Sequence, residues 1–191
     1  MNAFCRPKIY LALVHHPVVN KNGDTVASAV TNLDLHDIAR AGRTYGARAF
    51  YVVTPLRDQI ALVERIVHHW TAGPGGTFNP NRREALRRIR IRPDLSGVVE
   101  DIERQEGAVP QTVGTCAREY PGAVGYEKLR EALSTGRPYV LVFGTAWGLS
   151  ETVLSGVDQV LEPVRGCGEY NHLSVRSAVS IILDRLLTVE K

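Results

Sequence analysis

Apolar runs that alternate with helical patterns are the feature that most constrains how this chain folds. The runs IYLALV (residues 9–14) and PYVLVFG (138–144) are almost wholly apolar, as in strands buried on both faces. Between them, LDLHDIARAGRTYG (33–46) repeats small and apolar residues at helical spacing. The face so formed carries Leu35, Ile38, Ala39 and Gly42. Strands that alternate with helices predict an α/β fold, with a mostly parallel sheet flanked by helices.

The rest of the chain continues this alternation. Thr31, Asn32 or Asp34 is available to cap the helix at 33–46, and Gly46 to end it. Residues 71–83 hold so much Gly, Pro and Asn that they predict a loop. Further strands are predicted at 47–53, 89–93, 109–116 and 157–164. Further helices are predicted at 56–70, directly after 83, at 95–105, 125–136 and 149–156, and from 175 onward.

The length of 191 residues predicts a single domain, residues 1–191, with a short tail at 1–8 and a basic loop and helix segment at 71–92. No apolar run approaches the roughly 20 residues of a membrane-spanning helix. The N-terminal apolar stretch is too short for a secretory signal. We therefore expect a soluble, cytoplasmic protein with no membrane partner.

Cysteine and histidine spacing predicts no metal site. The three cysteines are an odd number without C-x-x-C spacing, which is typical of reduced thiols. Adjacent histidines occur at 15–16 and 68–69. Neighbouring side chains point in different directions on a strand or a helix, so each pair offers at most one ligand to a given site.

Basic residues are concentrated between Arg82 and Arg92, where six arginines accompany one glutamate, although the net charge of the chain is only +3. Such a cluster favours a polyanion, because the planar guanidinium group bonds two phosphate oxygens at once. A solvated helix face is the alternative interpretation.

Familiar nucleotide and nucleophile motifs are missing from the sequence. There is no G-x-x-x-x-G-K-[ST], and no G-x-G-x-x-G opens a helix after the first strand. These absences argue against a nucleoside triphosphatase, a Rossmann dehydrogenase and a Rossmann-type methyltransferase. The absence of G-x-S-x-G argues against a serine hydrolase.

Three glycine-bearing loops each follow a predicted strand: TVGTCARE (112–119), LVFGTAWGLSE (141–151) and VLEPVRGCGEYNHLS (160–174). Ligands of parallel sheets bind beyond the carboxyl ends of the strands, and glycine lets backbone N–H groups approach a ligand closely. For the third loop alone, an ordinary connection capped by Ser174 is the alternative.

In this order the loops resemble the SPOUT superfamily of RNA methyltransferases. The segment TNLDLHDIARAGRTYGARAFYVV (31–53) agrees, because it looks like the SPOUT segment in which an Asn-rich turn leads to a helix with an arginine six residues before a glycine. Here these two are Arg40 and Gly46. The resemblance covers most of residues 9–188 and is nearest to a family of small bacterial SPOUT proteins similar to the tRNA (guanine-N1)-methyltransferase C-terminal domain.

The resemblance implies a SPOUT fold with a C-terminal deep trefoil knot, a homodimer, S-adenosylmethionine as cofactor, and RNA (tRNA or rRNA) as substrate. It implies that Arg40 orients RNA phosphate or assists the acceptor, in its own site or in that of a partner subunit. Asn32 and Asp34 would hold the target nucleotide, with Asp34 as the base where the acceptor is a ring nitrogen. Helix capping is the alternative for these two residues.

The implied contacts form two larger sets. The cofactor-binding residues are Gly114, Thr115, Phe143, Gly144, Thr145, Gly148, Leu149, Leu161, Pro163, Gly166, Asn171, His172, Leu173 and Ser174. Gly168 would also allow a close approach, and Leu149, Leu161 and Leu173 would sandwich the adenine ring. The RNA-binding residues are Arg82, Arg83, Arg87 and Arg88.

One position departs from the superfamily pattern. Many ribose-methylating SPOUT enzymes have a glutamate two residues beyond the glycine of the FG loop, where this chain has Ala146; Glu151 lies nearby in sequence. The target atom therefore stays open. The alternative function is a catalytically inactive RNA-binding or regulatory SPOUT protein that retains the cofactor pocket, and a third is an α/β enzyme for another nucleotide.

Overall fold

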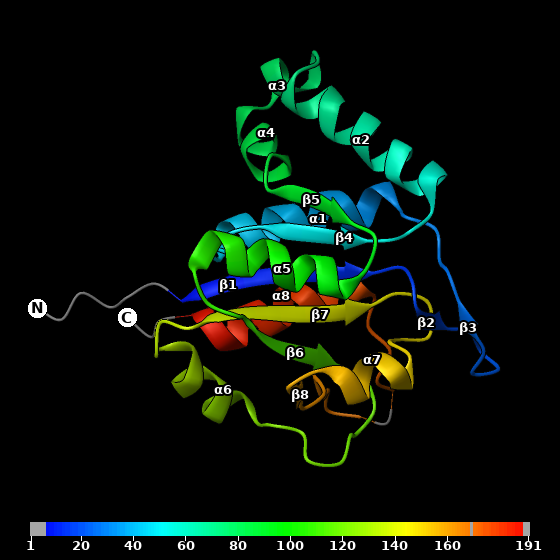
Figure 1. Ribbon diagram of the computed structural model, residues 1–191, viewed down its shortest axis with the longest axis vertical. Helices are drawn as coiled ribbons and strands as arrows, with labels where there is room; N and C mark the ends of the chain where they lie inside the picture. Colours follow the sequence, from blue (N-terminus) through cyan, green and yellow to red (C-terminus); the bar gives the residue numbers. More distant parts are fainter. Residues whose placement is uncertain (1–6, 169, 189–191) are drawn as a thin grey trace, which may run out of the picture.

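The computed structural model describes residues 7–168 and 170–188, which build a parallel six-stranded sheet between two layers of helices (Figure 1). The strand order is β5-β4-β1-β7-β6-β8, and every neighbouring pair is parallel. The strands are β1 (Lys8–Val14), β4 (Phe50–Val53), β5 (Ile89–Arg92), β6 (Gln111–Thr115), β7 (Pro138–Gly144) and β8 (Gln159–Leu161). The predicted α/β class and parallel sheet are confirmed.

The two helical layers bury opposite faces of the sheet. Side chains alternate along a strand, so Ile9, Leu11 and Leu13 of β1 pack with α1 and α8, while Tyr10 and Val14 face the layer of α5 and α7. The helices are α1 (Asn32–Thr44), α2 (Arg57–Thr71), α3 (Gly75–Phe78), α4 (Pro80–Leu86), α5 (Leu95–Glu106), α6 (Tyr126–Leu133), α7 (Glu151–Gly156) and α8 (Val175–Leu187). The layer of α1 and α8 also receives α4 and α6.

The predicted loop at 71–83 is wrong, because most of it is helical. Asn79 accepts a hydrogen bond from the Arg82 amide, and Pro80 occupies the first helical position, so α4 begins with a strong local start signal. The glycines of α3 lie directly against Trp70: a Cβ on Gly76 would stand 2.4 Å from the Trp70 carbonyl oxygen. These glycines serve close packing rather than a flexible connection.

A hairpin of β2 (Val18–Val19) and β3 (Thr25–Val26) was not predicted. Two-residue strands are too short to show the alternation by which a strand is recognised in a sequence. The hairpin lies between β1 and α1, at the carboxyl ends of the strands (Figure 1).

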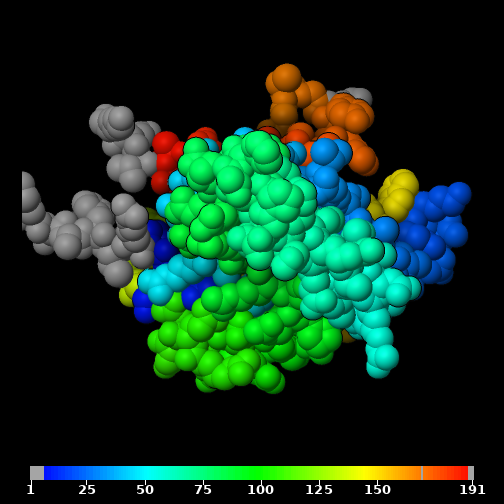
Figure 2. Space-filling view, turned by 90° about the horizontal axis from the view of Figure 1, so that it is seen from above, coloured from blue at the N-terminus to red at the C-terminus, as the bar shows by residue number. Residues whose placement is uncertain are grey.

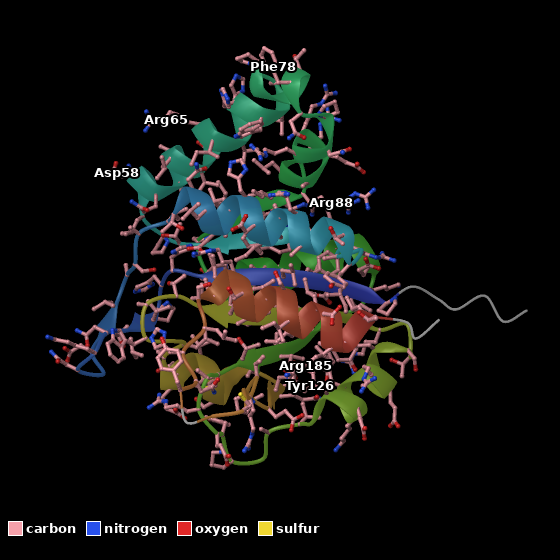
Figure 3. All side chains as sticks on the ribbon, turned by 180° about the vertical axis from the view of Figure 1, so that it is seen from behind. Asp58, Arg65, Phe78, Arg88, Tyr126 and Arg185 are labelled. Carbon is pink, nitrogen blue, oxygen red and sulfur yellow. The ribbon has the colours of Figure 1, made fainter. Side chains whose placement is uncertain are left out.

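Helices α6 and α8 pack together beside the sheet. The Arg185 guanidinium lies 5.2 Å from the centre of the Tyr126 ring, and both residues are labelled in Figure 3. The aromatic face and the cation attract one another, which joins the last helix to α6. The trefoil knot and the single-domain organisation stay predictions.

Candidate functional site

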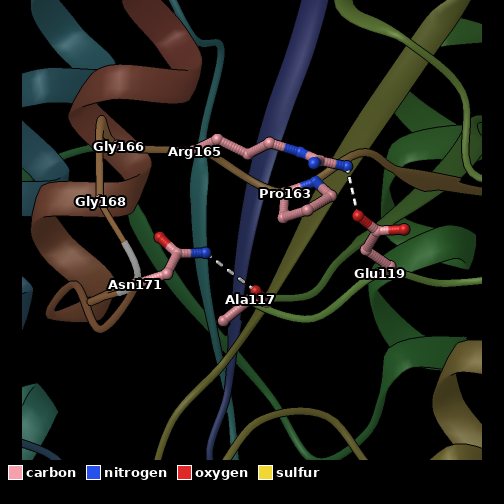
Figure 4. Close-up of a pocket in the computed structure, with 7 residues that line it drawn as sticks. All are labelled: Ala117, Glu119, Pro163, Arg165, Gly166, Gly168 and Asn171. Atoms are coloured by element: carbon pink, nitrogen blue, oxygen red, sulfur yellow. Dashed lines mark hydrogen bonds and ion pairs between the residues drawn. The ribbon is translucent and has the colours of Figure 1, made fainter.

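The three glycine-bearing loops meet at one end of the sheet. Strands β7, β6 and β8 are neighbours and parallel, so the loops that leave their carboxyl ends come together. The loops after β6 and β8 enclose a hollow of about 290 Å³, shown in Figure 4. Its lining residues are Ala117, Glu119, Pro163, Arg165, Gly166, Gly168 and Asn171. The Asn171 side chain donates a 3.1 Å hydrogen bond to the Ala117 carbonyl and so joins two of the loops.

Only some of the predicted cofactor residues line this hollow. Pro163, Gly166 and Asn171 line it directly, as does Gly168. Several others are buried at the strand ends: Gly114, Phe143, Thr145, Leu149 and Leu161. His172 and Leu173 are exposed. Ser174 caps α8 by accepting from the Ser177 amide, so the ordinary capping role is present as well.

The turn at 144–149 is tight and needs glycine at its start. A Cβ on Gly144 would stand 2.4 Å from the Leu149 amide nitrogen, a distance that real side chains do not tolerate. The Gly148 amide donates to the Thr145 carbonyl at 2.9 Å. Gly148 has φ +110° and Ala146 has φ +52°, which is an uncommon conformation for a residue other than glycine.

Two charged residues that the sequence analysis did not select lie at the hollow. Arg165 Nη2 and Glu119 Oε1 are 2.5 Å apart and bridge the loops after β8 and β6 (Figure 4). Both side chains are largely exposed, so the pair contributes little to stability. It presents opposite charges to any ligand with an amino-acid group. The sequence signal that could have identified Arg165 and Glu119 is their position directly after two predicted strands.

A second hollow of about 480 Å³ lies beside the first and shares Glu119 with it. The Tyr120 hydroxyl donates to Glu151 Oε1 at 2.9 Å within it. Glu151 begins α7 and is engaged by Tyr120, whereas Ala146 lies in the turn before that helix.

The start of α1 carries the predicted acceptor-side residues. Thr31, not Asn32, caps the helix, since its hydroxyl oxygen accepts from the Asp34 amide. Asp34 is buried and accepts from the Thr31 hydroxyl at 2.6 Å. Arg176 of α8 lies 3.4 Å from the Asp34 carboxylate and 3.6 Å from that of Asp37.

Arg40 and Asn32 differ from Asp34 in exposure. The Arg40 side chain is 57% exposed and lies 4.0 Å from the Asp37 carboxylate. Asn32 is exposed at the first position of α1. These two side chains are accessible to a large ligand. The Asp34 carboxylate is instead engaged by Thr31 at the start of α1 and by Arg176 of α8.

The predicted RNA-binding arginines also differ from one another. Arg88 donates to the Ala47 and Arg48 carbonyls at 3.1 and 3.2 Å, so it stabilises the fold directly. Arg82 lies over the Trp70 ring at 4.6 Å. Arg87 is exposed, and Arg83 is half-buried. Beyond these four, Arg90 and Arg92 form ion pairs with Asp101.

Arg82, Arg83, Arg87 and Arg88 belong to a projecting unit formed by α2, α3, α4 and the two residues that follow α4, which we call the helical outcrop (residues 57–88). It stands beyond the β5 edge of the sheet, and in the view from above it covers the middle of the molecule, with residues 163–168 and 170–173 projecting past it (Figure 2). Phe78, at its tip, is 88% exposed (Figure 3). Residues 57–88 contain six arginines and three acidic residues, an excess equal to the net charge of the whole chain.

Within residues 7–168 and 170–188, no group of three His, Cys, Asp or Glu side chains is arranged to hold a metal ion. In the same residues, no helix combines the length and the apolar character needed to cross a bilayer.

Comparison with known proteins defines the class. A family model described as SAM-dependent RNA methyltransferase matches residues 8–188. A protein of Nitratidesulfovibrio vulgaris (strain Hildenborough) named tRNA (guanine-N(1)-)-methyltransferase is 49% identical over 179 residues, which are 94% of this chain and 42% of that protein. An uncharacterized protein of Aquifex aeolicus is 41% identical over 181 residues, 94% of this chain and 88% of that protein.

Among solved structures, the SpoU methyltransferase AviRb of Streptomyces viridochromogenes in complex with AdoMet superimposes with a TM-score of 0.55. The match covers 95% of this chain and 57% of that one at 16% identity, so it shows the fold. The parallel sheet with its loop-lined end therefore has the same fold as that SpoU methyltransferase.

The chain belongs to the family of SAM-dependent RNA methyltransferases, because the family model spans nearly its whole length. The description of this family names S-adenosylmethionine as the cofactor and RNA as the class of substrate. The chain spans less than half the length of the Nitratidesulfovibrio relative.

Proposed function

We propose that the protein transfers a methyl group from S-adenosylmethionine to tRNA in the cytoplasm, with a ring nitrogen of guanine as the acceptor. The observation that carries this proposal is that the three loops leave neighbouring strands of the sheet at the same end, where those after β6 and β8 enclose a hollow. The name of the Nitratidesulfovibrio relative supports tRNA and guanine as the choice of substrate.

The residues at the hollow fit the cofactor. Its volume of about 290 Å³ lies near the lower end of small-molecule sites. A Cβ on Gly166 or Gly168 would meet open space, so backbone groups there are accessible to an adenosine. Arg165 and Glu119 offer opposite charges for the carboxylate and ammonium of the amino-acid part. Leu149 and Leu161 are buried at the neighbouring strand ends and do not line the hollow, so their contact with the adenine stays a prediction.

When bound, S-adenosylmethionine supplies an activated methyl group on a sulfonium sulfur. The protein must therefore orient the acceptor in line with that bond and accept the acceptor's proton. We assign the orientation of RNA to Arg40, whose guanidinium is exposed and so accessible to phosphate. Asn32 binds the target base, and the Asp34 carboxylate accepts its proton once the contact with Arg176 loosens.

The helical outcrop supplies the RNA surface in this proposal. Arg83 and Arg87 bind phosphate, and Arg82 does so from its place over Trp70. Arg88 holds the base of the surface through its contacts with backbone carbonyls. The exposed ring of Phe78 stacks on an unpaired base, as aromatic side chains do in single-stranded RNA recognition.

The protein forms a homodimer in this proposal, through the adjoining starts of α1 and α8. Leu33 in α1 is 60% exposed and Leu173 just before α8 is 42% exposed, and the Arg176 contact with Asp34 joins these two helices. In a dimer these two side chains would join across the interface into a contiguous apolar area, the kind of surface that marks an interaction site. Sedimentation of wild type and Leu33→Asp tests the interface. The wild type is expected to sediment as a dimer and the variant as a monomer; a monomeric wild type would contradict it.

The experiment that tests the function is methyl transfer from labelled cofactor to RNA lacking modifications, followed by nucleoside mass spectrometry of the product. We expect methylguanosine in the tRNA pool, and loss of transfer in Arg40→Ala. Mass spectrometry of RNA from a deletion strain is expected to lack the same nucleoside. Label in rRNA alone, or none in any RNA pool, would contradict the proposal; the second result favours an RNA-binding protein without catalysis.

A further inference from the structure

Three polar side chains form a hydrogen-bonded series that joins the end of β1 to the turn at 144–149. His15 is fully buried, and its Nδ1 lies 3.0 Å from the Ser28 hydroxyl. Ser28 lies 2.5 Å from the Thr145 hydroxyl, which in turn lies 3.0 Å from the Val14 carbonyl. These residues come from the end of β1, from the segment before α1 and from the predicted cofactor loop.

The number of protons available on each side chain fixes the direction of every hydrogen bond in this series. A carbonyl only accepts, so the Thr145 hydroxyl donates to Val14. Thr145 has no second proton, so Ser28 donates to Thr145, and His15 Nδ1–H must donate to Ser28. His15 Nε2 is then the unprotonated nitrogen, and it has no hydrogen-bond partner among the residues the structure describes.

The electrostatics agree with a neutral imidazole. Burial lowers the pKa of His15 to about 4, although the Asp34 carboxylate and the Ala29 backbone act in the other direction. His15 is therefore uncharged near neutral pH and held as one tautomer. An uncharged donor with fixed direction is suited to orienting a neighbour rather than to binding an anion.

Backbone contacts fasten the same two segments together. The Trp147 amide donates to the Val19 carbonyl, and the Val19 amide donates to the Gly148 carbonyl, both at 3.0 Å. Val18 and Leu149 form an antiparallel bridge. The segment 15–30 thus lies against the turn at 144–149 and continues directly into α1, which carries Arg40.

We propose that His15 is a positioning residue for methyl transfer, which through Ser28 and Thr145 holds the turn at 144–149 in register with the start of α1. The cofactor loop and the acceptor-side helix come from distant parts of the chain, and this hydrogen-bonded chain fixes one against the other. This inference rests on the proposed function, because the two sides matter together only when a methyl group passes between them.

The test compares His15→Leu with His15→Asn. The Asn side-chain amide places a donor near the Nδ1 position, whereas Leu fills the space without one. We expect His15→Leu to lower kcat about tenfold, the scale of one lost directional hydrogen bond, with the RNA KM unchanged. His15→Asn is expected to restore kcat to within about threefold of wild type. Ser28→Ala, a small change in volume, is expected to match His15→Leu and to add nothing to it in the double variant.

Amide hydrogen exchange supplies a readout that does not depend on activity. We expect the amides of residues 145–149 to exchange faster in His15→Leu and Ser28→Ala, and at the wild-type rate in His15→Asn. His16→Leu is the matched control, because His16 is the neighbouring half-buried histidine and makes no side-chain hydrogen bond within the described residues. If His15→Leu does not fold, Ser28→Ala and His15→Asn carry the comparison.

Unchanged exchange and unchanged kcat in folded Ser28→Ala would overturn the inference, as would a His15→Asn variant that folds but behaves like Leu. Failure of the proposed function is a separate result, since wild type would then methylate no RNA. In that case the exchange data alone decide whether His15 holds the turn.

Discussion

The two ends of the sheet are built in different ways. At the amino end, Glu106 closes α5 with a carboxylate that accepts from Tyr10 and forms ion pairs with Lys8 and Arg48. Its side chain is 4% exposed. At the carboxyl end, glycine turns surround an open hollow, Trp147 is exposed, and His15 keeps one nitrogen without a partner in the described residues.

The amino end of the sheet therefore serves the stability of the fold, and the carboxyl end serves ligand binding. Burial alone would raise the pKa of Glu106, but hydrogen bonds from Tyr10 and Lys8 and the charge of Arg48 hold it below its ordinary value. Every polar group of that cluster is used for the fold. The carboxyl end leaves polar and backbone groups accessible, which is what a ligand site needs. Substitutions at the two ends should therefore have separable effects.

The largest effect is expected from Gly144→Ala at the carboxyl end. The new Cβ would lie 2.4 Å from the Leu149 amide nitrogen, so the turn must shift by about 1 Å, and a displacement of that size costs about 100-fold in rate. Calorimetry with S-adenosylmethionine and a transfer assay check this. Gly156→Ala is the control, because its Cβ would meet open space. Equal losses in both variants would contradict the role of the turn.

A loss of about 100-fold in kcat is expected from Arg40→Ala, within the usual range for one positioned catalytic group. The side chain is exposed, so thermal unfolding should stay unchanged. Arg104→Ala is matched to it, since both are exposed helical arginines with an aspartate three residues earlier. Similar kinetics of the two variants would remove Arg40 from the site.

At the amino end, Glu106→Gln should lower the free energy of unfolding by about 3 kcal/mol, because it leaves Lys8 and Arg48 without their partner. Transfer kinetics should stay at wild-type values. Denaturant titration and the transfer assay measure both quantities, with exposed Glu103→Gln as the control. A drop in kcat of Glu106→Gln without a loss of stability would contradict the assignment of separate roles to the two ends.

The smallest effect is a pH dependence that originates at the carboxyl end. The pKa of His15 is about 4 in the folded chain and 6.5 when exposed, so the unfolded chain binds more protons between these values. Stability from this residue is complete above pH 6.5 and declines as the pH falls toward 4, by about 2 kcal/mol at pH 5. His15→Asn should flatten this part of the curve, measured by denaturant unfolding from pH 7 to pH 5. Parallel curves for the two proteins would contradict it.

Much of the fold was predictable, because its signals are local. Apolar runs gave β1 and β7, and helical spacing gave α1 with its buried Leu35 and Ile38. The position of the three loops after strands also followed from the chain order. What stayed hidden depends on contacts between distant residues: Ser28 with Thr145, Arg165 with Glu119, and Arg88 with the Ala47 carbonyl. Local composition also failed at α3 and α4, where Trp70 determines what the glycines do.

The most direct test of the central claim is amide hydrogen exchange of the wild-type protein with and without S-adenosylmethionine. Binding should slow exchange in residues 115–119, 144–149 and 163–173, and leave the amino end around Glu106 unchanged. Slowed exchange confined to other parts of the chain, or no change at saturating cofactor, would contradict a cofactor site at the carboxyl end of the sheet.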